Sequence, residues 1–141
     1  MAVKKISHIY ETDPEGGPKQ PDYLNAAVEI ETVLNAAELL KVCLDVEKEM
    51  GRVKSDTKYH FVKWGPRNID IDLLLYDNLI LKTSDLTVPH PFMHKRKFVL
   101  HPLSDIAPDI VHPVVGSTVN ELKVKAGKAG IRKKDDLKLD V

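Results

Sequence analysis

Alternation of apolar and polar residues predicts strands in the first third of the chain. Residues 6–12 alternate Ile, His and Tyr against Ser, Ile and Glu, as a strand with one buried face does. Residues 13–21 hold three prolines and two glycines, a composition typical of a loop. The clearest strand covers residues 23–34, where Leu24, Ala26, Val28 and Ile30 share one face.

The apolar period then changes from two to that of a helix. Asn35 and Glu38 have the spacing of a capping box, and a buried stripe follows, ending at Gly51 and made of Leu39, Cys43, Val46 and Met50. Residues 68–76 predict a further strand, which Leu79–Leu81 extends into a hairpin. Helical turns follow over 92–100 and 103–107, broken at Pro102, and over 119–124. This mixture predicts an α+β sandwich in which helices cover a mainly antiparallel sheet.

Length and charge restrict the classes of function. A chain of 141 residues has the size of one domain, which we place at 1–124 with a polar tail or linker stub at 125–141. The formal net charge is zero, which gives no general attraction to nucleic acid or to an anionic membrane. Cys43 is the single cysteine and no apolar run approaches the roughly 20 residues of a membrane span. We therefore expect a soluble protein of the cytoplasm.

Asp70 and Asp72 are the strongest local candidates for chemistry. In a strand, residues two apart project to the same face, so the two carboxylates would stand side by side. Mg²⁺ characteristically binds one or two carboxylates together with substrate phosphates and water. An exposed strand face with two solvated carboxylates explains an isolated Asp-x-Asp motif about equally well.

Cationic residues flank this acidic pair. Trp64-Gly65-Pro66-Arg67 leads into the predicted strand, and a run from His94 to Lys97 follows His90. Arginine's planar fork suits phosphate oxygens, so the cluster predicts a nucleotide polyphosphate site. A solvated basic surface and a loop histidine between two prolines are the structural alternatives. No glycine-rich phosphate motif of the P-loop, dinucleotide or protein-kinase type is present.

Tyr23 and Asn25 share one face of their predicted strand beside the Gly/Pro loop. An aromatic ring and a side-chain amide suit a flat heterocycle, through stacking and paired hydrogen bonds. The pattern alone favours a half-exposed tyrosine and an asparagine near a turn.

Taken together, these motifs resemble the 6-hydroxymethyl-7,8-dihydropterin pyrophosphokinase family. The most specific matches are W-G-P-R-x-x-D-x-D at 64–72 and L-T-V-P-H at 86–90, and the likeness runs from Ile6 to about Val119. It implies a ferredoxin-like α/β sandwich and transfer of diphosphate from ATP to the hydroxymethyl group of a reduced pterin, releasing AMP.

The resemblance also implies roles for individual residues. Two Mg²⁺ ions would bind Asp70 and Asp72, while Arg52 and Arg67 would neutralise the moving diphosphate. The ATP side would be formed by Glu47, Trp64, Arg67, Leu73, Thr87, His90 and Arg96. The pterin side would be formed by Thr12, Pro14, Glu15, Tyr23, Asn25, Trp64 and Phe98, with the rings of Tyr23 and Phe98 on either face of the pterin.

The chain departs from the family's pattern at its start, where a first strand, a Gly-Ser-Asn loop and a first helix are expected and are not found. Two hypotheses follow: an active pyrophosphokinase, and a folded but inactive nucleotide- and pterin-binding module of a larger folate-pathway enzyme. Further folate-pathway domains, or a second chain that completes the sheet, are the partners that the departure suggests, and an organelle matrix is the second compartment. A Mg²⁺-dependent nuclease would use the acidic pair but not Tyr23, Asn25 and Phe98.

Overall fold

The computed structural model describes residues 1–13, 23–55 and 69–137, with the side chains of 51–55 left out. The chain forms two compact units, one from Met1–Val33 with Pro91–Val141 and the other from Leu34–His90. Helices and antiparallel strand pairs occur together, which confirms the predicted α+β class. None of the described helices is both long and apolar enough to cross a membrane.

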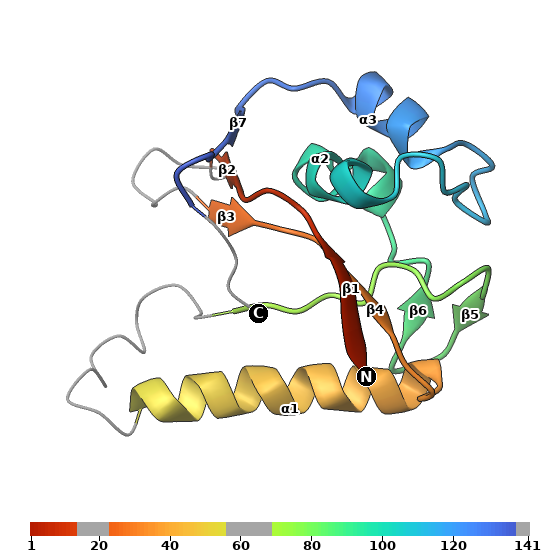
Figure 1. The fold of residues 1–141 in the computed structure, drawn as a ribbon. Coiled ribbons are helices and arrows are strands. Elements are labelled where there is room, and N and C mark those ends of the chain that lie inside the picture. The colour runs from red at the N-terminus through yellow and green to blue at the C-terminus, as the bar shows by residue number, and fades with distance from the viewer. Residues whose placement is uncertain (14–22, 56–68, 138–141) are drawn as a thin grey trace. The chain divides into compact units, whose positions relative to one another are not determined.

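In the first unit, four short strands replace the two predicted from the alternation (Figure 1). β1 (Ala2–Ile6) pairs with β4 (Val28–Glu31), and β2 (Tyr10–Thr12) pairs with β3 (Tyr23–Asn25). The predicted strands over 6–12 and 23–34 were therefore wrong in extent. Each predicted strand is divided into two, because Ser7 and Ala27 lie between the paired segments and leave strand geometry. These two residues bond each other: Ser7 N–H donates to Ala27 O at 2.9 Å, and Ala27 N–H donates to Ser7 Oγ at 2.7 Å.

The helices of this unit form its core. α2 (Lys97–Ile106) follows a short 3₁₀ helix, η2 (Met93–Lys95), and packs on α3 (Val119–Ala126) and on β2. The residues that these helices bury are Met93, Leu100, Leu103, Ile106, Val119 and Leu122. The predicted break at Pro102 was wrong: the helix continues through it, and burial of Leu100, Leu103 and Ile106 outweighs the missing backbone hydrogen bond.

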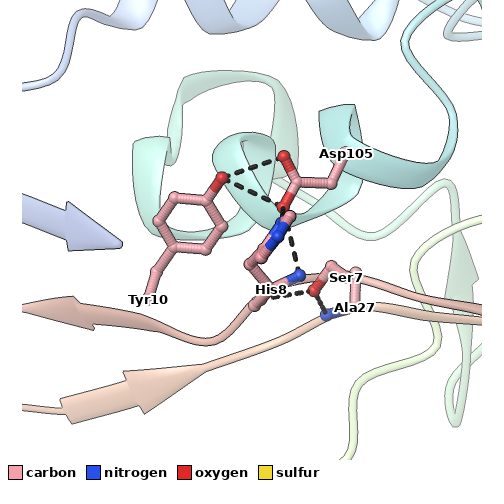
Figure 2. A network of polar contacts seen from close by, with 5 residues as sticks. All are labelled: Ser7, His8, Tyr10, Ala27 and Asp105. Atoms are coloured by element: carbon pink, nitrogen blue, oxygen red, sulfur yellow. Dashed lines mark hydrogen bonds and ion pairs between the residues drawn. The ribbon is translucent and has the colours of Figure 1, made fainter. Parts of the chain in front are cut away.

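A polar network ties β2 to α2 (Figure 2). The carboxylate of Asp105 accepts hydrogen bonds from the Tyr10 hydroxyl at 2.9 Å and from the His8 backbone N–H at 3.2 Å. Burial, together with the hydrogen bond and the charge of Asp105, raises the pKa of Tyr10. The network thus fixes the strand that leads to Thr12.

Part of the segment 125–141, predicted as a polar tail or linker stub, forms regular secondary structure. α3 extends to Ala126, and β7 (Ile131–Lys133) adds to β2 on the side opposite β3, as Figure 1 shows. Thr118 and Glu121 form a capping box that starts α3.

In the second unit, α1 (Ala36–Ser55) begins with the predicted capping box: Glu38 N–H donates to Asn35 Oδ1 at 2.8 Å, and Asn35 N–H donates to Glu38 Oε1 at 3.0 Å. The helix runs four residues beyond the predicted end at Gly51. β5 (Leu81–Lys82) pairs with β6 (Thr87–Val88). The prediction that 79–81 forms a hairpin with 68–76 was therefore wrong. The predicted strand over 68–76 was also wrong for its described part, since residues 69–76 form no ladder.

Candidate active site

The segment that carries Asp70 and Asp72 is held by packing and hydrogen bonds within the second unit. Leu73 and Tyr76 pack against a buried cluster of Ala36, Leu86 and Val88. The Tyr76 hydroxyl donates to the Leu34 carbonyl oxygen.

Backbone hydrogen bonds complete this anchorage. Ile71 N–H donates to Glu47 Oε2 at 2.5 Å, and His90 N–H donates to the Leu74 carbonyl oxygen at 2.8 Å. The Asp-x-Asp segment is therefore fixed by packing and by capture of its amides, without strand neighbours among the described residues.

The acidic pair is open to solvent and lies near His90. Asp72 has a side chain 57% exposed, and its Oδ1 lies 3.9 Å from His90 Nε2, an ion pair when the imidazole is protonated. Asp70 is also exposed. The structure thus brings together Asp72, His90 and, through the Ile71 amide, Glu47. Leu73 and Thr87, the other nucleotide residues predicted here, are partly buried in the same unit.

Exposed carboxylate oxygens are the donors that Mg²⁺ prefers. Across the described ranges, no three His, Cys, Asp or Glu side chains gather to hold a metal ion. A full protein cage is not needed for Mg²⁺, which takes one or two carboxylates and completes its shell with phosphates and water. The donor set therefore fits the predicted ion.

The first unit contains a separate cavity of about 390 Å³. Predicted residues Thr12, Arg96 and Phe98 line it, and its remaining wall is made by Asp13, Lys95, Lys97, Ala129, Gly130 and Ile131. The Arg96 guanidinium carbon lies 5.7 Å from the centre of the Phe98 ring, a cation–π contact. A basic rim beside an aromatic ring suits a flat, electron-rich or anionic ligand.

Strand pairing places the other predicted pterin residues next to Thr12. Tyr23 lies opposite Thr12 in the β2–β3 ladder, and Asn25 Nδ2 donates to Thr12 Oγ1 at 3.3 Å. Tyr23 is 47% exposed, so much of its ring is open to a ligand. Thr12 at the end of β2 and Phe98 at the start of α2, both named from the sequence, therefore line the same cavity of the first unit.

Several predicted residues lie outside what the structure describes. Pro14, Glu15, Trp64 and Arg67 fall outside the described residues, and Arg52 lies in the last turns of α1, where side chains are not described. In the other direction, sequence reasoning missed Asp13 and Ala129–Ile131 as cavity residues. The only signal for the latter was one apolar residue, Ile131, after Gly130 in a polar run.

These features define a class of protein: an α+β chain with exposed carboxylates in one unit and a basic, aromatic-lined cavity in the other. The 7,8-dihydro-6-hydroxymethylpterin-pyrophosphokinase (HPPK) family matches residues 1–108. Two relatives named 2-amino-4-hydroxy-6-hydroxymethyldihydropteridine pyrophosphokinase align over most of the chain. The one from Bacillus subtilis is 41% identical, covering 91% of this chain and 73% of the relative, and the one from Aquifex aeolicus is 42% identical, covering 87% and 73%.

A third relative is much longer. The Folic acid synthesis protein FOL1 of Dictyostelium discoideum is 41% identical over 91% of this chain, and the match spans 19% of that protein's length. The chain belongs to the HPPK family.

Proposed function

We propose that this chain transfers the terminal diphosphate of ATP to the hydroxymethyl group of 6-hydroxymethyl-7,8-dihydropterin, releasing AMP, as a step of folate biosynthesis. Family membership and the names of the aligned relatives support the reaction. The structural observation that carries it is the exposure of Asp70 and Asp72, with His90 beside Asp72, on a segment anchored by Glu47.

In this reaction the pterin hydroxyl oxygen attacks the β-phosphorus of ATP. The bond from that phosphorus to the oxygen bridging to the α-phosphate breaks, AMP leaves with the bridging oxygen, and the proton of the hydroxyl passes to water. No covalent enzyme intermediate is needed, so the chain's task is positioning and charge stabilisation.

The nucleotide side is assigned to residues of the second unit and to Arg96 of the first. Asp70 and Asp72 would hold two Mg²⁺ ions, which would supply positive charge against the phosphates. His90 and Arg96 bind nucleotide phosphates, and Arg52 and Arg67 neutralise the moving diphosphate. Leu73, Thr87 and Trp64 complete the ATP side.

The pterin side is assigned to Thr12, Tyr23, Asn25 and Phe98, with Pro14, Glu15 and Trp64. Tyr23 and Phe98 stack on the ring faces and Asn25 hydrogen-bonds to the polar edge. The exposure of Tyr23 and the position of Phe98 in the cavity wall support this assignment.

Two broader assignments are also proposals. The short share of the Dictyostelium protein that this chain matches supports association with further folate-pathway domains. The neutral net charge argues against nucleic acid as a partner, and the cytoplasm or an organelle matrix is the expected compartment.

AMP release by the purified chain with Mg-ATP, with and without the pterin, tests the function. We expect AMP only when the pterin is present, and loss of turnover in Asp70→Ala and Asp72→Ala with the fold retained. Asp45→Ala removes an exposed carboxylate from α1 and is the matched control. Absence of pterin-dependent AMP from folded protein would favour the inactive binding module, and near-normal rates in either site variant would refute the metal assignment.

A further inference from the structure

The last described strand forms part of the cavity wall. β7 runs antiparallel to β2, with Ile131 opposite Thr12, and Asp13 N–H donates to the Gly130 carbonyl oxygen at 3.1 Å. Lys134 N–H donates to the Ile9 carbonyl oxygen at 2.8 Å, which continues the pairing to the other end of β2. Ala129–Ile131 therefore face the same cavity as Thr12 and Asp13 because of this register.

Arg132 joins two acidic side chains on β2 and just beyond it. Its Nε donates to Glu11 Oε1 at 3.0 Å, and its Nη2 lies 3.0 Å from Asp13 Oδ1. Glu11 and Asp13 are two residues apart in extended chain, so their carboxylates would repel each other on one face. One guanidinium, using two different nitrogens, offsets both charges and leaves Thr12 between the two anchored positions.

Space beside Asp13 is limited on the β7 side. Gly130 has φ of +77°, and a Cβ added there would lie 3.1 Å from Asp13 Oδ2. A side chain at this position would be strained and would press on the carboxylate that Arg132 holds. Gly130 thus permits β7 to approach Asp13 closely, as the ion pair between Arg132 and Asp13 requires.

We propose that Arg132 is a positioning residue for the pterin side of the site: by holding Glu11 and Asp13 it fixes Thr12 in the cavity wall. The proposal rests on the proposed function. Ion pairs open to water contribute little to stability, and the Arg132 side chain is 44% exposed, so the effect is expected on ligand binding and not on folding.

The test compares Arg132→Gln with Lys133→Gln, which removes one exposed positive charge from the same strand. For each protein, KM for pterin, KM for ATP and kcat are measured from pterin-dependent AMP release. We expect Arg132→Gln to raise the pterin KM by about five- to tenfold, the size of one or two charge-assisted hydrogen bonds exposed to water, with ATP KM and kcat within about twofold. Arg132→Lys keeps the charge but loses the planar guanidinium fork, so its pterin KM should lie between those of the unaltered chain and Arg132→Gln.

A pterin KM for Arg132→Gln within twofold of that for Lys133→Gln would overturn the proposal, as would an equal rise in the ATP KM. Thermal unfolding of each variant checks the fold, and Arg132→Lys decides by the same criteria if Arg132→Gln does not fold.

Binding of the oxidised analogue 6-hydroxymethylpterin, measured without ATP and followed by its fluorescence, separates this proposal from the reaction itself. If the unaltered chain binds the analogue but releases no AMP, the proposed function fails, and the affinities of Arg132→Gln and Lys133→Gln still decide the role of Arg132. If the unaltered chain binds no pterin, both proposals fail.

Discussion

Glu47→Ala is expected to raise the Mg²⁺ concentration that the reaction requires. In the structure Glu47 Oε2 accepts the N–H of Ile71, the residue between Asp70 and Asp72, in a partly buried contact. The substitution leaves this amide without its carboxylate partner and releases the segment that carries the acidic pair. The resemblance implied a contact of Glu47 with ATP, whereas the geometry supports an indirect role.

The size of the effect follows from the kind of bond. A hydrogen bond to a charged group contributes roughly 1.5–3 kcal/mol, and about 1.4 kcal/mol corresponds to a factor of ten in an equilibrium. Glu47→Ala should therefore raise the Mg²⁺ concentration for half-maximal AMP release by about ten- to a hundredfold. Glu47→Gln keeps a neutral acceptor. Its Mg²⁺ requirement should fall between those of the unaltered chain and Glu47→Ala, because neutral hydrogen bonds are about half as strong.

The assay is a Mg²⁺ titration of AMP release at fixed ATP and pterin, with circular dichroism as the check on folding. Glu49→Ala removes an exposed carboxylate from the same helix and is the matched control. A Mg²⁺ requirement in Glu47→Ala equal to that of Glu49→Ala would refute the reasoning. A rise confined to the ATP KM would instead support direct contact with the nucleotide.

Three further variants test other parts of the structure. Asp105→Ala leaves the buried Tyr10 hydroxyl unpaired and should lower the free energy of unfolding by about 2 kcal/mol, roughly 6 °C in Tm; an unchanged Tm would contradict the role of the network. Burial and the neighbouring His94 lower the pKa of His112, so its stabilising contribution is complete above the unfolded value of about 6.5 and is lost as pH falls below it. Between pH 7.5 and pH 5.5, Tm should therefore drop less in His112→Asn than in the unaltered chain. An equal drop in both would refute this role of His112. Phe98→Ala should raise the pterin KM by about tenfold or more, the value of one stacking contact, and spare ATP; unchanged pterin affinity would exclude stacking.

Local signals in the sequence predicted where α1 begins. The Asn35/Glu38 capping box starts α1 as expected, because this motif satisfies backbone groups independently of tertiary contacts. Pro102 was misjudged for the opposite reason: whether a helix tolerates proline depends on what its neighbours bury, here Leu100 and Leu103 in the core with α3.

Strand partners could not be predicted from alternation. The apolar residues of 68–76 do indicate burial, since Leu73 and Tyr76 pack on Ala36 and Val88, but an apolar pattern does not show whether a ladder partner exists. β7 was missed because three residues with one apolar side chain carry too little periodicity, and its pairing with β2 is a contact between the two ends of the sequence.

Candidate site residues could be proposed from the sequence where a chemical role follows directly from residue type and spacing. Asp70, Asp72 and His90 belong to motifs, and the structure places His90 against Asp72. Arg132 belongs to no motif, and its importance depends on a register that pairs residue 132 with residue 11. Residues that act by holding others are found only once the pairing is known.

The order of the two units along the chain has a consequence for synthesis on the ribosome. Leu34–His90 is one continuous stretch, whereas the first unit is made of Met1–Val33 and Pro91–Val141. At about 5–20 residues per second, β2 leaves the ribosome several seconds or more before its partner β7 exists. The edge of β2 that β7 will cover is meanwhile open to other chains, and the continuous unit is free to fold first. A nascent chain stalled before residue 131 should therefore aggregate more readily than the finished protein.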